Sequence, residues 1–99
     1  MNIVEQNISG VYDLCKQHNV KNMYLFGSIL TKKFTSNSDV DFLVCFDNVD
    51  LPQYFNNYMD FKEKLERLLN RPVDLLEEQT LNNPVLRRSI ERNKKLIYG

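Results

Sequence analysis

The chain has 99 residues, of which 42% are hydrophobic and 26% charged, and its formal net charge is zero. This length suits one compact domain over residues 1–99 and leaves little room for a separate substrate-binding domain. Balanced charge argues against direct nucleic-acid binding, which depends on neutralising phosphates, and no apolar run approaches the ~20 residues of a membrane helix.

The first segment has the apolar spacing of an amphipathic helix. Apolar residues recur every three or four positions over residues 4–18, which predicts a helix there. Asn2 and Glu5 suit a capping box at its start. Asn19 is a candidate for the left-handed residue that ends it.

Two short strands are predicted next. Residues 23–26 form a buried strand candidate that ends at a Gly-Ser pair, and residues 29–34 suit one or two helical turns. Four turn-forming residues follow at 35–38. Residues 40–46 are apolar and rich in β-formers, which predicts the second strand.

The second half of the chain alternates helix and strand. Aromatic and leucine residues at helical spacing predict a long helix over residues 52–70, and residues 73–76 a third strand. Asn83 is the expected N-cap of a last helix with Pro84 at its first position, and this helix is expected to carry Val85, Leu86 and Ile90 inward. Residues 96–98 suit a short edge strand. The order αβ(α)βαβα predicts an α/β (α+β) fold with a small mixed sheet flanked by helices.

Cysteine usage bears on the compartment. Cys15 and Cys45 are the only cysteines, they are not in a CxxC pair, and no secretory signal precedes the first helix. We therefore expect free thiols in a reducing compartment and a cytoplasmic protein.

The second strand opens with two acidic residues. Side chains alternate along a strand, so Asp39 and Asp41 are expected to share one face. Two neighbouring carboxylates repel each other unless a cation neutralises them. Mg²⁺ takes one or two carboxylates and completes its shell with water and phosphate oxygens. For this pair alone, an exposed strand end without a role is the alternative.

Two further features support a phosphate-handling site. A glycine after a buried strand lets the backbone approach a phosphate, so Gly27 and Ser28 could bind one, although a simple turn is the alternative. Asp74 lies between apolar residues of the third strand and would join the acidic pair if that strand neighbours the second. It could ligate a second metal or accept a proton from a hydroxyl.

These motifs together resemble a known family. Residues 25–28 (LFGS), 38–42 (SDVDF) and 73–75 (VDL) are similar to the signature of the minimal nucleotidyltransferase (MNT) group in the DNA polymerase beta-like superfamily. That signature is GS, about ten residues, DxD and a distal acid. The resemblance covers essentially the whole chain and implies a nucleotidyltransferase with the polymerase beta-like palm fold.

Roles follow residue by residue from this resemblance. It implies that Gly27 and Ser28 hold the phosphates of the donor, ATP. It implies that Asp39 and Asp41 bind the metals, two Mg²⁺ ions, and that Asp74 is a third ligand or the general base.

The resemblance also implies a partner. MNT proteins are often antitoxins that transfer AMP from ATP to tyrosine hydroxyls of a HEPN-domain toxin. We therefore expect a protein adenylyltransferase whose acceptor is such a toxin, while self-association stays open. Transfer to a small molecule or to a nucleic acid is disfavoured, because those enzymes carry an additional domain.

One segment departs from the family. Many members continue GS with a stretch like RARG, whereas residues 29–33 here are Ile-Leu-Thr-Lys-Lys. Lys32 or Lys33 could supply the positive charge, as a point charge rather than a bidentate fork. The departure favours one alternative, a catalytically weak or inactive module that neutralises its partner by occlusion.

Other polar and aromatic residues have simpler interpretations. His18 closes an apolar stripe and is expected to cap a helix C-terminus. Tyr54, Tyr58 and Phe61 have helical spacing and are expected in the core. Three arginines of the last helix could contact an acidic partner, the nucleotide or solvent: Arg87, Arg88 and Arg92.

Overall fold

The computed structural model describes residues 2–99, and it contains one four-stranded sheet with strand order β3-β2-β1-β4. The central strands β1 (Val20–Phe26) and β2 (Val40–Phe46) are antiparallel. At one edge β3 (Val73–Glu77) runs parallel to β2, and at the other β4 (Lys95–Tyr98) runs antiparallel to β1. The predicted mixed sheet is confirmed, including the returning edge strand.

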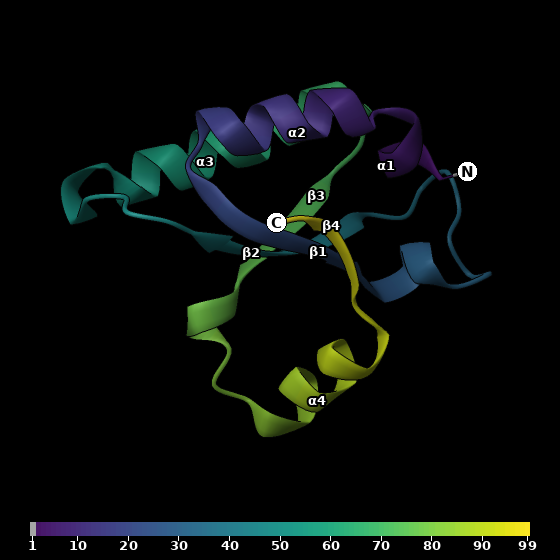
Figure 1. Cartoon of the computed structure of the whole chain (residues 1–99). Helices are drawn as coiled ribbons and strands as arrows, with labels where there is room; N and C mark the ends of the chain where they lie inside the picture. Colours follow the sequence, from purple (N-terminus) through teal and green to yellow (C-terminus); the bar gives the residue numbers. More distant parts are fainter. Residues whose placement is uncertain (1) are drawn as a thin grey trace.

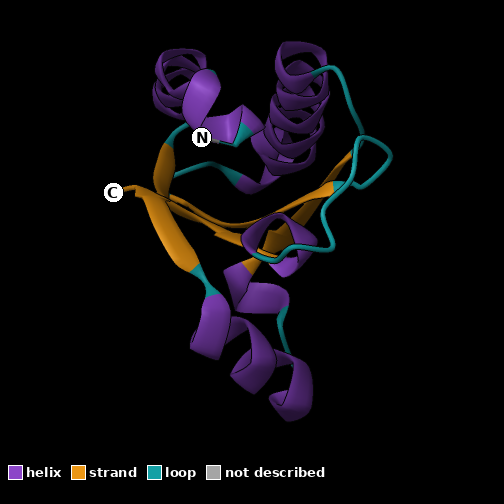
Figure 2. Cartoon of the chain, turned by 90° about the vertical axis from the view of Figure 1, so that its right-hand side faces the viewer, coloured by secondary structure: helices purple, strands orange, loops and turns teal. Residues whose placement is uncertain are grey.

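Helices lie on both sides of this sheet. Helices α2 and α3 pack side by side over one face, and α4 stands alone on the opposite side (Figures 1 and 2). None of the helices over residues 2–99 is long and apolar enough to cross a bilayer. The helical elements are α1 (Ile3–Gln6), α2 (Ile8–Gln17), α3 (Leu51–Leu69), α4 (Pro84–Asn93) and two short 3₁₀ turns, η1 (Gly27–Leu30) and η2 (Glu78–Thr80).

The first predicted helix is broken at Asn7, so the expectation of one continuous helix was wrong. The Asn7 side chain donates a hydrogen bond to the carbonyl of Ile3 (2.8 Å) and its φ of −115° leaves the helical range. Asparagine competes in this way for backbone groups. The predicted ends are confirmed: the Glu5 N–H donates to Asn2 Oδ1 (2.9 Å), and Asn19 has a φ of +58°.

Two further boundaries differ from the prediction. The turn after β1 spans Gly27–Leu30 rather than residues 29–34. Both the N–H and the hydroxyl of Thr31 donate to the carbonyl of Ser28 (2.9 and 2.8 Å), which closes the turn after one cycle. The 3₁₀ turn η2 was not predicted, because its sequence carries no apolar period.

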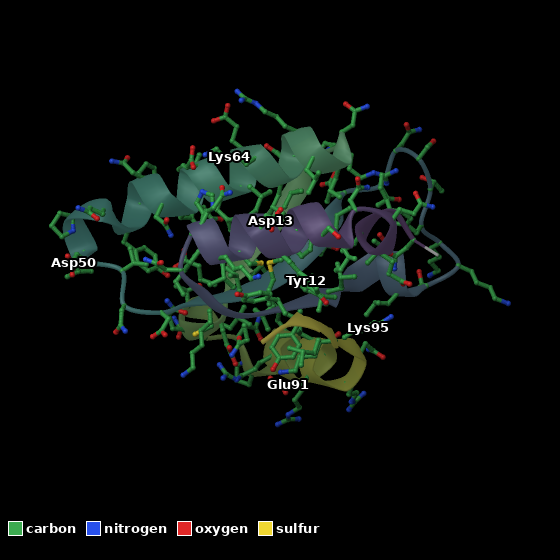
Figure 3. All side chains as sticks on the ribbon, turned by 45° about the horizontal axis from the view of Figure 1, so that its top comes forward. Tyr12, Asp13, Asp50, Lys64, Glu91 and Lys95 are labelled. Carbon is green, nitrogen blue, oxygen red and sulfur yellow. The ribbon has the colours of Figure 1, made fainter. Side chains whose placement is uncertain are left out.

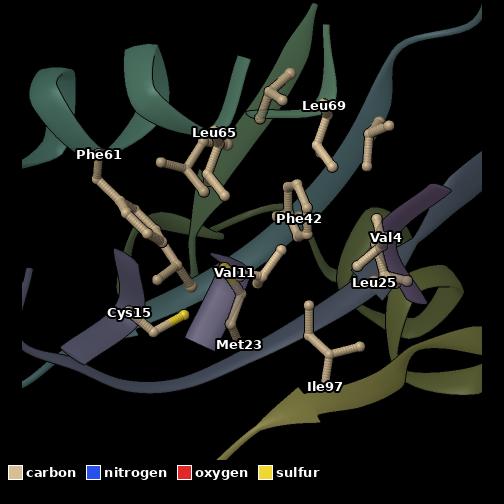
Figure 4. Close-up of a cluster of buried hydrophobic side chains, with 14 of the residues drawn as sticks. Val4, Val11, Cys15, Met23, Leu25, Phe42, Phe61, Leu65, Leu69 and Ile97 are labelled. Carbon is tan, nitrogen blue, oxygen red and sulfur yellow. The ribbon is translucent and has the colours of Figure 1, made fainter. Parts of the chain in front are cut away.

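The hydrophobic core lies between the sheet and the pair α2/α3 (Figure 4). Alternate side chains of β2 belong to this core, and one of them, Phe42, is fully buried. Cys15 and Cys45 are free thiols, as expected. Burial raises the pKa of the Cys15 thiol to about 12, so it packs as a small apolar group.

The buried histidine joins α2 to α3. His18 follows the last residue of α2, and its Nδ1 donates to the carbonyl of Leu14 (2.7 Å), which confirms the predicted capping role. Its Nε2 lies 2.7 Å from Asp60 Oδ2. The same Asp60 carboxylate accepts from Lys64 (2.8 Å).

Candidate functional site

Two of the predicted acidic residues lie side by side across two parallel strands. Asp41 in β2 is the register partner of Asp74 in β3. The neighbours of Asp41 in the chain, Val40 and Phe42, are fully buried. Asp41 and Asp74 therefore lie on the opposite face, toward α4, because side chains alternate along a strand. Asp39 immediately precedes β2 and is exposed.

The glycine of the Gly-Ser pair lies against the same carboxylate. Phe26 is the register partner of Asp41 in the antiparallel pair β1–β2, and Gly27 follows it with a φ of +80°. A Cβ at Gly27 would lie only 2.1 Å from Asp41 Oδ2. Glycine is therefore needed here both for its left-handed backbone and for the space that Asp41 occupies. Ser28 is half-buried in η1.

The acidic residues influence one another electrostatically. Burial, followed by the negative charges of Asp74 and Asp39, raises the pKa of Asp41 to about 6. Each effect disfavours the ionised carboxylate. A cation placed among these groups would reverse the penalty, and all of the groups are hard oxygen donors.

The fit to a metal depends on how many protein ligands the ion needs. Over residues 2–99, no three His, Cys, Asp or Glu side chains converge closely enough to hold an ion by themselves. Mg²⁺ commonly uses one or two carboxylates and takes its other ligands from water and substrate phosphates. The register pair Asp41–Asp74, with the exposed Asp39 beside it, fits Mg²⁺ brought in with a nucleotide.

A cleft of about 470 Å³ opens beside Gly27, between η1 and α4. The α4 side of this cleft was not predicted as part of a site, although its polar residues Ser89 and Asn93 are one helical turn apart. The residues lining the cleft are Phe26, Gly27, Leu30, Thr31, Leu86, Ser89, Ile90 and Asn93.

Helix α4 contacts the rest of the protein less than its sequence suggested. Ile90 is buried as expected, but Val85 is 75% and Leu86 41% exposed, so their predicted inward positions were wrong. The spacing of apolar residues predicts which face of a helix is apolar, but it does not predict whether another element covers that face. Of the three arginines, Arg87 donates to the carbonyl of Leu81 (3.2 Å).

The remaining predicted candidates belong to the framework. Phe61 is fully buried, and the half-buried Tyr58 donates from its hydroxyl to the carbonyl of Leu75 (2.5 Å). The hydroxyl of Tyr54 donates to Glu77 and accepts from Gln79 (2.7 Å). These aromatic side chains fix α3 to β3, on the side of the sheet away from the acidic residues.

Comparison with known proteins gives this geometry a family. The model of the family described as "Polymerase beta, Nucleotidyltransferase" matches residues 10–99. A Methanocaldococcus jannaschii protein that is provisionally named a protein adenylyltransferase is 38% identical over 82 residues, which is 83% of this chain and 79% of that protein.

Solved structures share the fold. A minimal nucleotidyltransferase matches with a TM-score of 0.77 and 28% identity, over 96% of this chain and 95% of that one. A toxin–antitoxin structure with AMP-PNP matches with a TM-score of 0.70 and 26% identity, over 96% and 73%. The complex of tri-AMPylated Shewanella oneidensis HEPN toxin with MNT antitoxin shares the fold at a TM-score of 0.66 and 22% identity, over 96% and 71%.

The family match, the relative and the sheet topology agree. The mixed four-stranded sheet is that of the polymerase beta-like fold predicted from the motifs. This chain therefore belongs to the polymerase beta nucleotidyltransferase family and is a nucleotidyltransferase of the minimal type.

Proposed function

We propose that this chain transfers AMP from ATP to a tyrosine hydroxyl of a HEPN-type toxin and so acts as its antitoxin, with residues 1–99 forming one minimal nucleotidyltransferase domain. The observation that carries the proposal is the register pair Asp41–Asp74 beside Gly27. The named activity of the Methanocaldococcus relative and the AMPylated toxin in a complex of the same fold support this acceptor class.

The position of each residue supports the role proposed for it. Gly27 and Ser28 bind the donor phosphates at the end of β1. Asp39 and Asp41 hold Mg²⁺, and two ions are expected. When bound, Mg²⁺ supplies the positive charge that stabilises the developing negative charge on the phosphates. Asp74 is the third ligand or the base.

The transfer itself exchanges one phosphorus–oxygen bond for another. The acceptor oxygen attacks the α-phosphorus, and the bond from that phosphorus to the bridging oxygen breaks, so pyrophosphate leaves with the electron pair. The hydroxyl proton passes to a carboxylate, and Asp74 is exposed on the face where a protein acceptor could reach it. The exposed Lys32 and Lys33 are the nearest replacements for the missing arginine in sequence.

A transfer assay tests the proposal. The chain is incubated with α-labelled ATP, Mg²⁺ and the protein encoded by the neighbouring gene. We expect label on that protein, and no label with the double variant Asp39→Asn/Asp41→Asn. The matched control is Asp13→Asn/Asp50→Asn, which removes two exposed acids from α2 and the start of α3 (Figure 3) and should leave transfer unchanged.

A second function has one observation in its favour. The segment after Ser28 lacks the arginine and glycine of the family pattern, and its two lysines are exposed. A module that neutralises its partner by occlusion would form a stable complex without transferring label from any of the four NTPs. It would also protect cells when Asp39 and Asp41 are both replaced by Asn.

A further inference from the structure

The loop that contains Asp39 is hydrogen-bonded to Arg71 and Pro72, which lie outside the loop. Residues 31–39 form neither helix nor strand. The carbonyl of Ser38, one residue before Asp39, accepts a hydrogen bond from Arg71 Nη1 (3.1 Å). The N–H of Val40, one residue after it, donates to the carbonyl of Pro72 (3.1 Å). The main chain on both sides of Asp39 is thus bonded to the two residues that precede β3.

Arg71 also contacts two earlier residues of the loop, Phe34 and Thr35. Its Nη1 donates to the carbonyl of Thr35 (3.2 Å), and its Cζ lies 4.7 Å above the centre of the Phe34 ring. Thr35 and Ser38 close a turn through two bonds, Ser38 N–H to the Thr35 carbonyl (3.1 Å) and Thr35 N–H to Ser38 Oγ (3.0 Å). One guanidinium group therefore fixes the turn that leads directly to Asp39.

The chemistry of the contact requires arginine. A planar guanidinium can stack on an aromatic ring while its N–H groups donate in the ring-parallel plane, whereas a lysine ammonium is a compact point charge. Arg71 Nε is buried and has no hydrogen-bond partner over residues 2–99. An unmatched buried donor opposes folding.

We propose that Arg71 is a positioning residue for the metal site, because it sets where the carboxylate of Asp39 lies relative to Asp41 and Asp74. The inference rests on the proposed function, since it takes Asp39 as a metal ligand. Asp74 follows Arg71 by three residues, so the segment that orients one proposed ligand leads directly into another. Outer partners of this kind typically change metal affinity about 10–100-fold when they are replaced.

The test uses Mn²⁺ as the probe and the folded protein as the sample. Mn²⁺ binding is followed by electron paramagnetic resonance in the presence of a non-hydrolysable ATP analogue. We expect Arg71→Met to weaken binding about tenfold or more, and Arg71→Lys to weaken it less. The control is Arg67→Met in the last turn of α3, where the exposed guanidinium pairs with Glu63 (2.5 Å).

A second measurement needs no metal. Amide hydrogen exchange in the metal-free protein should accelerate at Ser38 and Val40 in Arg71→Met, while the β1–β2 amides stay protected. If Arg71→Met does not fold, Arg71→Lys and Phe34→Leu, which removes the ring contact, carry both measurements.

Two results would count against the inference in different ways. If the wild-type chain binds Mn²⁺ and the folded Arg71 variants bind it equally well, Arg71 is a structural residue only and the inference is overturned. If the wild-type chain itself does not bind Mn²⁺ with the nucleotide, the proposed metal site fails, and the inference fails with it.

Discussion

The two faces of the sheet are built for different purposes. Toward α2 and α3, β2 presents Val40, Phe42 and Val44, none of which is exposed. Toward α4, the same strand presents Asp41, whose ionised form is disfavoured by its surroundings. The helix on that side, α4, leaves Val85 75% exposed.

This difference shows how a small domain can separate stability from chemistry. Because side chains alternate along a strand, neighbouring residues of β2 can belong to the core and to the candidate site. The covered face supplies the apolar burial, and the other face carries like charges that oppose folding. Removing an apolar side chain from the covered face should therefore lower stability, whereas removing a charge from the other face should raise it.

The largest effect should come from the covered face. Phe42→Ala removes a fully buried ring from the core and should lower the free energy of unfolding by about 3–5 kcal/mol. Urea denaturation of the wild-type and variant proteins measures this difference in the free energy of unfolding. Leu96→Ala, on the half-exposed Leu96 of β4, is the control and should cost far less. An equal loss in both variants would contradict the view that this face carries the stability.

The contact between β1 and Asp41 should give the next largest effect. Gly27→Ala forces a side chain into a left-handed backbone and against Asp41 Oδ2, so we expect a loss of about 1–3 kcal/mol together with lost nucleotidyl transfer. The control is Gly10→Ala in α2, where the added Cβ meets only the flexible Leu68 side chain. Thermal unfolding of both variants measures the two losses. If Gly27→Ala leaves the stability unchanged, the contact with Asp41 does not exclude a side chain at residue 27.

On the site face, removing a charge should stabilise the metal-free protein. The folded pKa of Asp41, about 6, exceeds its unfolded value. Ionisation of Asp41 therefore costs no stability below pH ~4, and the free energy of unfolding falls as the pH rises through 6. After allowance for solvent screening, Asp41→Asn should gain about 1–2 kcal/mol at pH 7.5 in EDTA. Asp13→Asn should gain nothing. A gain that persists at pH 3 would contradict an electrostatic origin.

The smallest effect belongs to the ion pairs at the rim of the covered face. Hydrogen bonds from Lys64 and then His18 lower the pKa of Asp60. Its contribution is therefore present above the unfolded pKa and is lost as the pH falls through the lower folded value. Asp60→Asn should cost a little stability at pH 6 and less at pH 2. Chemical denaturation at the two pH values gives the difference, and 1 M salt should reduce it.

Local patterns in the sequence were sufficient for most of the framework. The spacing of apolar residues located β2 at residues 40–46, and Asn19 and Asn70 end their helices with positive φ values of 58° and 54°. These features depend on residues close together in the chain. The expected pairing of Asp41 with Asp74 followed only on the condition that their strands were neighbours, which the register confirms.

What could not be predicted depends on contacts between distant residues. Arg71 bonds to Ser38 across 33 positions, and nothing in the spacing of either residue indicates that contact. The burial of Val85 and Leu86 in α4 was wrongly predicted for the same reason, because the spacing of apolar residues does not show how closely the helix packs against the sheet. The steric demand at Gly27 was missed because it comes from Asp41 on another strand.

The loop from η1 to β2 has a consequence for length variation. An added residue between Thr31 and Phe34, outside the turn that Arg71 holds, would lengthen an exposed loop, where insertions are tolerated. The same residue added between Asp39 and Phe42 would shift the strand by one position, so that a carboxylate would turn into the core and a phenyl ring onto the site. Insertions and deletions should therefore collect before the acidic pair and stop abruptly at it.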